Sequence, residues 1–302
     1  MHKGLIIIIL LFFALSSCNN SSRKSADEDF EIPDSVKNYQ GELEVSKETM
    51  SDIVENISSP IEMAALMLDL DIPFSKDYIT TTDNLANYTT SYQKAITLGI
   101  FGADLGYLNM YNKTSVVLDY ITAIKDLADG IKVGQFFDFT TLKRLVTNKT
   151  NLDSLMLISQ QNFNKMDEYL RENNRSNLSI LIITGTWIEG MNLITEVIKE
   201  HPHEKINEFI GDQKTIVSIV HGLLDNYKKD PFFQDLANDF QELKTIYEEV
   251  SITTEVTDPK PVEVDGVLVF ESAEVSIVNI SDETISKINK KVSEIRKKII
   301  SV

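Results

Sequence analysis

Hydrophobic residues recur at intervals of three and four along most of the chain beyond about residue 41. This spacing places apolar side chains on one helical face and therefore predicts amphipathic helices. The stretch from Leu178 to Lys199 is apolar almost all round its first half, as in a helix at the centre of a bundle. Its Ile180–Ile183 run also fits a buried strand, but the total length favours a helix. The predicted helices cover about 45–57, a segment that begins at Ser59-Pro60, 85–110, 115–128, 152–170 behind an Asn151 cap, 178–199, 202–227 and 231–250.

Between about 251 and 280 the pattern changes from helical to alternating. Ser251–Val256 alternates apolar and polar residues, and Val262–Phe270 does so around Asp265-Gly266. An Asp-Gly pair flanked by such runs predicts a β-hairpin. Val275–Ile280 predicts a third strand. We expect a small sheet that caps one end of the bundle or offers an edge to a partner strand.

The last segment predicts a helix that starts after Ser281. Ser281 stands at the N-cap, and acids follow it in the first turn, where the helix dipole favours negative charge. Positive charge lies at the other end, at Lys297 and Lys298. The buried stripe is expected to contain Ile285, Ile288, Val292, Ile295 and Ile299.

These patterns predict a mainly α fold, a multi-helix bundle with a small antiparallel β-hairpin or sheet before the C-terminal helix. Residues 41–302 are expected to form a single helical domain with a β insertion at about 251–280, because no long Pro/Gly/Ser linker divides them. Residues 18–40 are polar and charged and predict a flexible tether.

The N-terminus has the pattern of a secretory signal peptide over residues 1–17. A positive start at Lys3 precedes an apolar run, Leu5–Leu15, about half as long as a membrane-spanning helix needs. The residues Leu15-Ser16-Ser17-Cys18 resemble the lipobox of bacterial lipoproteins. That resemblance implies cleavage before Cys18, acylation of its thiol and attachment to a membrane through the lipid. An ordinary signal peptide with a chance cysteine is the alternative.

The resemblance also bears on the compartment. Asn19 differs from the aspartate that retains such proteins in the inner membrane, so it implies an outer-membrane protein. The acidic residues within 27–31 are similar to the surface-export signals of some lipoproteins, but they lie farther from the cysteine than such signals usually do. The periplasmic and the surface face of the membrane are therefore both left open.

The charge excludes one class of partner. The whole chain has a formal net charge of −17. Removal of residues 1–17 takes away one lysine, which leaves 28 basic and 46 acidic residues, or −18. Such a protein repels nucleic acid, so no nucleic-acid partner is expected.

Motifs for catalysis and cofactor binding fail on spacing. The chain lacks Gly-x-Gly-x-x-Gly, a phosphate loop and Gly-x-Ser-x-Gly, and Cys18 is its only cysteine. His203-Glu204 begins a zinc-protease motif, but Asn207 stands where the second histidine is required. His201 and His203 are interpreted as solvated, and His221 as a core-edge residue. We expect no metal and no cofactor.

Two glycine-bearing segments are the strongest candidates for a binding site. One has Gly99, Gly102 and Gly106, whose spacing predicts a close approach on one helical face, and the other has Gly185 and Gly190. They either pack tightly or form the floor of a pocket. The candidate ligand-binding residues beside them are Asp104, Tyr107, Asn109, Trp187 and Glu189.

A buried acid at such a site needs a hydrogen-bond donor or a cation as its partner. Arg144 and Arg175 are candidates that the sequence does not place.

The segments Gly102–Tyr107, Asn174–Asn177 and Thr184–Gly190 resemble a group of uncharacterised lipoproteins from anaerobic bacteria. The resemblance implies an envelope setting without a mechanism. The leading hypothesis is a non-enzymatic binding or assembly module whose partner is an envelope protein or a small molecule. One alternative is an envelope hydrolase with Asp104 and Glu189 as acid and base. The other is a structural subunit without a ligand pocket.

Overall fold

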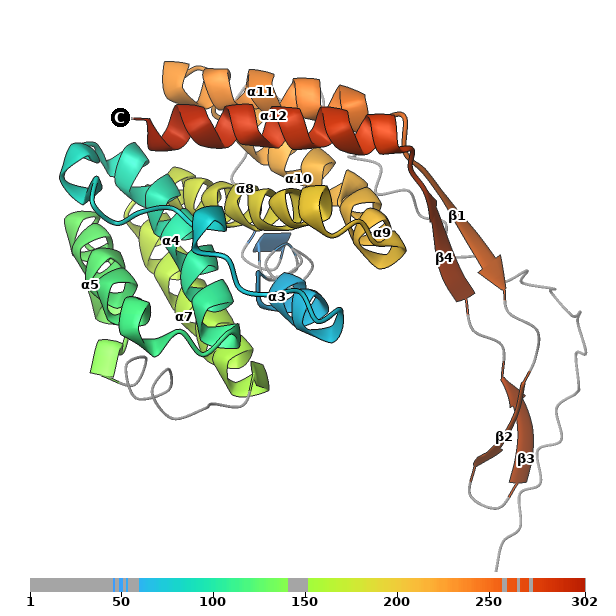
Figure 1. Ribbon diagram of the computed structural model, residues 1–302. Coiled ribbons are helices and arrows are strands. Elements are labelled where there is room, and N and C mark those ends of the chain that lie inside the picture. The colour runs from blue at the N-terminus through green and yellow to red at the C-terminus, as the bar shows by residue number, and fades with distance from the viewer. Residues whose placement is uncertain are drawn as a thin grey trace, which may run out of the picture. The chain divides into compact units, whose positions relative to one another are not determined.

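Helix α8 (Ser176–Glu200) lies at the centre of the helices, and Figure 1 shows others on both sides of it. The computed structural model describes residues 46, 49–50, 53, 60–140, 152–256, 260–264, 267–271 and 274–301. Between Leu178 and Ile198 only Thr186 and Glu196 are not buried. The prediction of a central helix, rather than a strand at Ile180–Ile183, is confirmed.

By length and composition α8 is also the one helix among the described residues that is apolar enough to cross a membrane. However, 94 % of its most apolar window is buried inside the protein, as is typical of the core helix of a folded domain.

Helix α4 (Ser91–Met110) approaches α8 closely through a pair of glycines. A Cβ atom at Gly99 would lie 2.0 Å from the Ile182 carbonyl oxygen, and one at Gly185 would lie 2.0 Å from the Ile96 carbonyl oxygen. Both obstacles are backbone atoms, so these two glycines serve helix packing. A Cβ at Gly102 would meet nothing within 4 Å. The prediction that Gly102 shares the close-contact face is therefore wrong.

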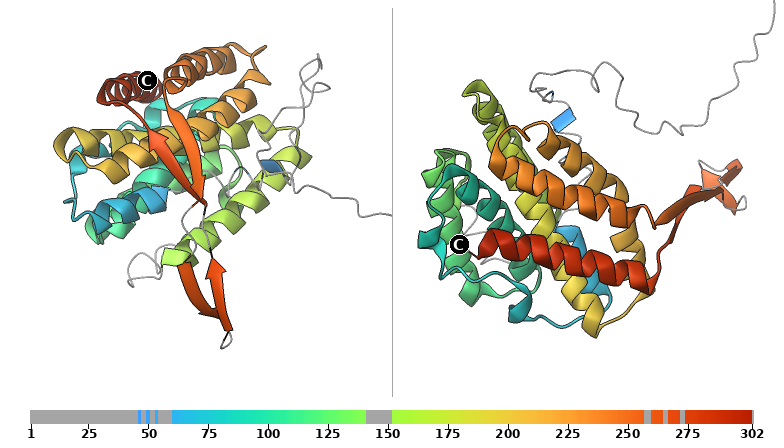
Figure 2. Two further views of the ribbon diagram at one scale, coloured as in Figure 1. Left: turned by 90° about the vertical axis from the view of Figure 1, so that its right-hand side faces the viewer. Right: turned by 90° about the horizontal axis from the view of Figure 1, so that it is seen from above.

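The remaining helices pack against this pair and complete the mainly α bundle that the sequence predicts. In Figures 1 and 2, α11 and α12 lie side by side, and α12 also contacts α8. Short 3-10 turns occupy Lys76–Tyr78 (η1), Leu85–Asn87 (η2) and Gly134–Phe136 (η3). The helices not yet named are α3 (Pro60–Asp69), α5 (Thr114–Gly130), α7 (Leu152–Glu172), α9 (Glu204–Asp212), α10 (Lys214–Asp225), α11 (Pro231–Tyr247) and α12 (Asp282–Ile300).

Two predicted helices have different boundaries in the structure. The segment predicted at 85–110 starts its helix only at Ser91, because Thr90 and Gln93 form a capping box that fixes the first turn there. The segment predicted at 202–227 is two helices, α9 and α10, separated at Gln213. The side chain of Gln213, the residue between them, accepts a hydrogen bond from Trp187 Nε1 at 3.1 Å. The predicted cap at Asn151 lies outside the described residues.

The β insertion forms two separate two-stranded antiparallel ribbons rather than one three-stranded sheet. The first pairs β1 (Ser251–Val256) with β4 (Glu274–Asn279). The second pairs β2 (Lys260–Val264) with β3 (Val267–Glu271). The strands and the hairpin are where the alternation predicts them. The alternation does not determine the strand order, in which the first strand pairs with the last.

The C-terminal helix α12 matches its predicted pattern closely. Ser281 Oγ accepts a hydrogen bond from the Thr284 N–H at 3.1 Å, and the predicted isoleucine and valine stripe is buried. Lys291 and Lys298 both form ion pairs with Asp239 of α11, at 2.9 and 2.6 Å. Apolar packing and ion pairs therefore both hold α12 against the bundle.

Candidate functional site

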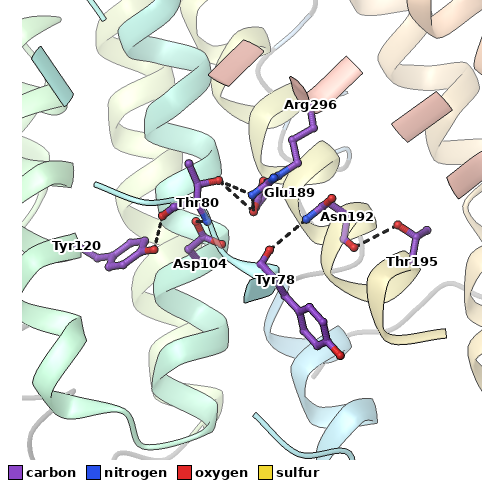
Figure 3. Close-up of polar contacts among 8 residues, drawn as sticks. All are labelled: Tyr78, Thr80, Asp104, Tyr120, Glu189, Asn192, Thr195 and Arg296. Carbon is purple, nitrogen blue, oxygen red and sulfur yellow. Dashed lines mark hydrogen bonds and ion pairs between the residues drawn. The ribbon is translucent and has the colours of Figure 1, made fainter. Parts of the chain in front are cut away.

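Two predicted site residues meet at the centre of the bundle. Asp104 comes from α4 and Glu189 from α8, and the glycine contact between these helices brings the two segments together. Both side chains are 0 % exposed, and Figure 3 places them next to each other. A pair of buried carboxyl groups requires a cation, a proton or both.

The cation is Arg296 of α12. Its Nε donates to Glu189 Oε2 at 2.5 Å and its Nη2 donates to Glu189 Oε1 at 2.7 Å. This two-point geometry is the strongest form of ion pair available to a carboxylate. The Arg296 side chain is 15 % exposed, so the ion pair is largely shielded from water.

Thr80, in the segment between η1 and η2, joins the cluster to other parts of the chain (Figure 3). Its N–H donates to Asp104 Oδ2 at 3.0 Å, and its hydroxyl accepts from Arg296 Nη2 at 2.6 Å. The Tyr120 hydroxyl of α5 donates to the Thr80 carbonyl oxygen. One polar cluster thus connects α4, α5, α8, α12 and the Thr80 segment.

Asp104 is the acid of this pair whose pKa is raised. Burial raises its pKa well above the ordinary 3.8, and the negative charge of Glu189 raises it further, while Arg296 and the Thr80 N–H act in the opposite direction. Asp104 Oδ1 has no hydrogen-bond partner among the described residues, so no donor at that oxygen stabilises the charged form. The surroundings of Asp104 therefore favour its neutral form beside the Glu189–Arg296 ion pair.

Replacing Asp104 with asparagine is expected to change how stability depends on pH. The folded protein keeps the Asp104 proton at pH values where the unfolded chain has lost it. Its contribution to stability is therefore complete below about pH 4 and is lost as the pH rises towards the folded-state pKa. The introduced asparagine mimics the neutral acid and does not titrate. The stability difference should move in favour of the variant above pH 4, by up to about 1.4 kcal/mol per pH unit.

Urea unfolding of both proteins from pH 4 to 8 measures this difference. Asp119→Asn, at an exposed position of α5, is the control and should run parallel to the wild type. Parallel curves for Asp104→Asn as well would show that Asp104 is ionised in the folded protein.

A second row of hydrogen bonds continues from this cluster along α8. Asn192 Nδ2 donates to the Tyr78 carbonyl oxygen at 3.1 Å, and Thr195 Oγ1 donates to the Asn192 carbonyl oxygen at 3.1 Å. Asn289 of α12 donates to the Thr195 carbonyl oxygen at 2.9 Å. Polar groups of α8 therefore also bind the Tyr78 segment and α12.

The other predicted site residues do not join the carboxyl pair. Tyr107 is buried and its hydroxyl accepts from the Ser75 N–H at 2.9 Å. Trp187 is buried against Phe240 of α11 and donates to Gln213. Asn109 is half-buried on the last turn of α4.

Neither arginine considered from the sequence is shown as the partner of the acids. Arg175 donates to the Ile131 carbonyl oxygen at 2.9 Å, and Arg144 lies outside the described residues, as does Cys18. The sequence did contain a signal for Arg296, because it follows Ile295 at the edge of the buried stripe of α12. A charged residue at such an edge can reach a buried partner, but the sequence does not say which one.

A surface hollow of about 370 Å³ lies away from the carboxyl pair, at the starts of α4 and α11. Its lining is mainly apolar, and none of the five predicted residues contributes to it. The lining residues are Thr90, Ser91, Tyr92, Gln93 and Phe232.

Metal-binding residues do not cluster in the part of the chain that the structure describes: no group of three or more His, Cys, Asp or Glu side chains could hold an ion there. His203 caps α9, where its Nδ1 accepts from the Lys205 N–H at 3.2 Å. His221 is half-buried, and burial lowers its pKa.

Comparisons with known proteins add no family to these observations. No protein-family model matches the chain, and neither does any curated protein or solved structure.

Proposed function

We propose that this chain is a lipid-anchored module of a bacterial envelope that binds another envelope component and carries out no reaction of its own. The anchor is the lipid on Cys18, in the outer membrane, as the resemblance of 15–18 to a lipobox implies. The observation that carries the proposal is that the two candidate catalytic acids, Asp104 and Glu189, make contacts within the bundle. Glu189, Asp104 and Arg296 neutralise one another inside the bundle and connect its segments.

This arrangement favours a binding role over a hydrolase. Acid–base hydrolysis by two carboxyl groups requires that substrate and water reach the space between them. Asp104 and Glu189 are 0 % exposed, and Arg296 holds both oxygens of Glu189. A pocket-free structural subunit is the second candidate. The single observation in its favour is that the most distinctive polar cluster connects chain segments of the protein itself.

Lipidation is tested by Cys18→Ala in the producing cell. The wild-type protein should partition into the detergent phase of a phase-separating surfactant, and its N-terminal peptide should have the mass of acylated Cys18. The variant should lack this modification, because no thiol is available for it. Ser21→Ala, three residues away, is the matched control and should remain acylated. An unmodified Cys18 in the wild-type protein would overturn the anchor.

The binding role is tested by native mass spectrometry of the full-length protein after gentle purification. A retained protein or small molecule, at a fixed stoichiometry, is the expected result. Turnover of an added envelope substrate that Asp104→Asn or Glu189→Gln abolishes, in variants that remain folded, would overturn it in favour of the hydrolase. Apo-protein in a defined oligomer would overturn it in favour of the structural subunit.

A further inference from the structure

The β1–β4 ribbon is fixed to the bundle at the roots of both strands. Val250, immediately before β1, is 1 % exposed, and its carbonyl oxygen accepts from Lys214 Nζ at 2.6 Å. Near the end of β4, Val278 packs so closely on α9 that a Cβ at Gly211 would lie 2.2 Å from its Cγ1. The α12 cap, Ser281, follows β4 after one residue. The direction in which the ribbon leaves the helices is therefore set by the bundle.

Beyond its roots the ribbon has an unpaired outer edge. In the described part of the chain β1 pairs with β4 alone, and β4 is the strand that contacts α9 (Figures 1 and 2). Residues Ser251–Glu255 are all exposed, and Ile252 is one of the few large exposed hydrophobic residues, at 38 %. Alternate N–H and C=O groups on the free side of a strand are available to another strand. A two-stranded ribbon in water is only marginally stable, so a third strand would stabilise it.

The charge of this segment defines the chemistry of an incoming strand. Residues 251–280 contain six acids and one lysine, a net charge of −5 in an already acidic protein. Glu255 is exposed on β1, on the strand with the free edge. A second acidic ribbon would be repelled, whereas an extended segment rich in lysine or arginine would be attracted.

We propose that the outer edge of β1 is a docking site for an extended, basic segment of a partner protein, which adds to the ribbon as a further strand. Main-chain hydrogen bonds provide the pairing and the acidic residues select for positive charge. Because the ribbon leads into α12 through a two-residue connection, a bound partner is held in a fixed orientation to the bundle. This inference rests on the proposed binding role and names the class of partner.

The test measures binding of short peptides to the full-length protein by fluorescence anisotropy. The probe is a seven-residue peptide of alternating lysine and valine, which should bind with a Kd in the micromolar range at low salt. The same peptide with N-methyl groups on three consecutive central residues keeps its charge but loses the donors of both edges. We expect it to bind at least tenfold more weakly.

A matched pair of protein variants locates the site. Glu255→Lys on β1 should weaken binding of the lysine–valine peptide about fivefold. Asp119→Lys, an equal charge change at an exposed position on α5, should leave the Kd within twofold. The ribbon proposal is overturned by equal binding of the N-methylated peptide, by equal effects of the two variants, or by no measurable binding. Retention of a partner in native mass spectrometry despite that failure would leave the proposed function standing, whereas loss of both would remove it.

Discussion

Replacing Arg296 with methionine is expected to lower the free energy of unfolding by about 3–5 kcal/mol. The change removes the cation that donates to both oxygens of Glu189, a side chain that is 0 % exposed. The stranded acid must then be buried unpaired or protonated, and both cost stability. The loss also frees the Thr80 hydroxyl from Arg296 Nη2 and weakens the hold on α12. Urea unfolding at pH 7 measures the effect.

Two controls separate this effect from a general weakening of α12. Lys297→Met, at the adjacent exposed position, should change stability by less than about 0.5 kcal/mol. The double variant Arg296→Met/Glu189→Leu removes both charges and should recover about half of the loss or more, because a buried ion pair can be replaced by apolar packing. If the free energy of unfolding of the single variant remains within about 1 kcal/mol of the wild-type value, the Glu189–Arg296 pair contributes no more to stability than an exposed ion pair does.

Alanine at Gly185 is expected to cost about 3 kcal/mol or more, although alanine is the better helix former. The added Cβ would lie 2.0 Å from the Ile96 carbonyl oxygen, a backbone atom that cannot move without separating α4 from α8. Separation of these helices would also disturb the contact between Asp104 and Glu189. Thermal and urea unfolding should both show the loss.

Gly102→Ala is the matched control on α4. A Cβ at Gly102 meets nothing within 4 Å, so the helix propensity of alanine should raise stability by up to about 1 kcal/mol. Opposite signs at Gly185 and Gly102 would locate the close approach at the Gly99–Gly185 contact. Equal effects at both positions would contradict this assignment.

The two sets of variants also bear on function. If the carboxyl cluster serves the fold, Asp104→Asn should leave partner binding unchanged at pH 7, because the neutral amide can take the place of the neutral acid. Glu255→Lys should have the reverse effect, with binding weakened and stability nearly unchanged. Such a separation would place recognition on the ribbon and stability in the bundle.

The sequence by itself determined the parts of the fold that depend on neighbours a few residues apart. Pro60, Asp230-Pro231 and Ser281 mark the starts of α3, α11 and α12, because capping and backbone restriction are local effects. The central position of α8 also followed from its composition, since a helix that is apolar all round is stable only when it is surrounded. Alternation around Asp265-Gly266 likewise predicted the β2–β3 hairpin.

Only the tertiary structure decided which distant groups meet. Glu189 and Arg296 are 107 residues apart in the chain, and their contact depends on where α12 docks. Periodicity indicates which face of a helix is buried but not the neighbour it faces, so Asp104 and Glu189 stood out while their cation did not. The pairing of β1 with β4 likewise depends on contacts between residues remote in sequence. Packing of the buried helix faces against one another thus brings the charges of Glu189 and Arg296 together and fixes the β1–β4 ribbon to the bundle.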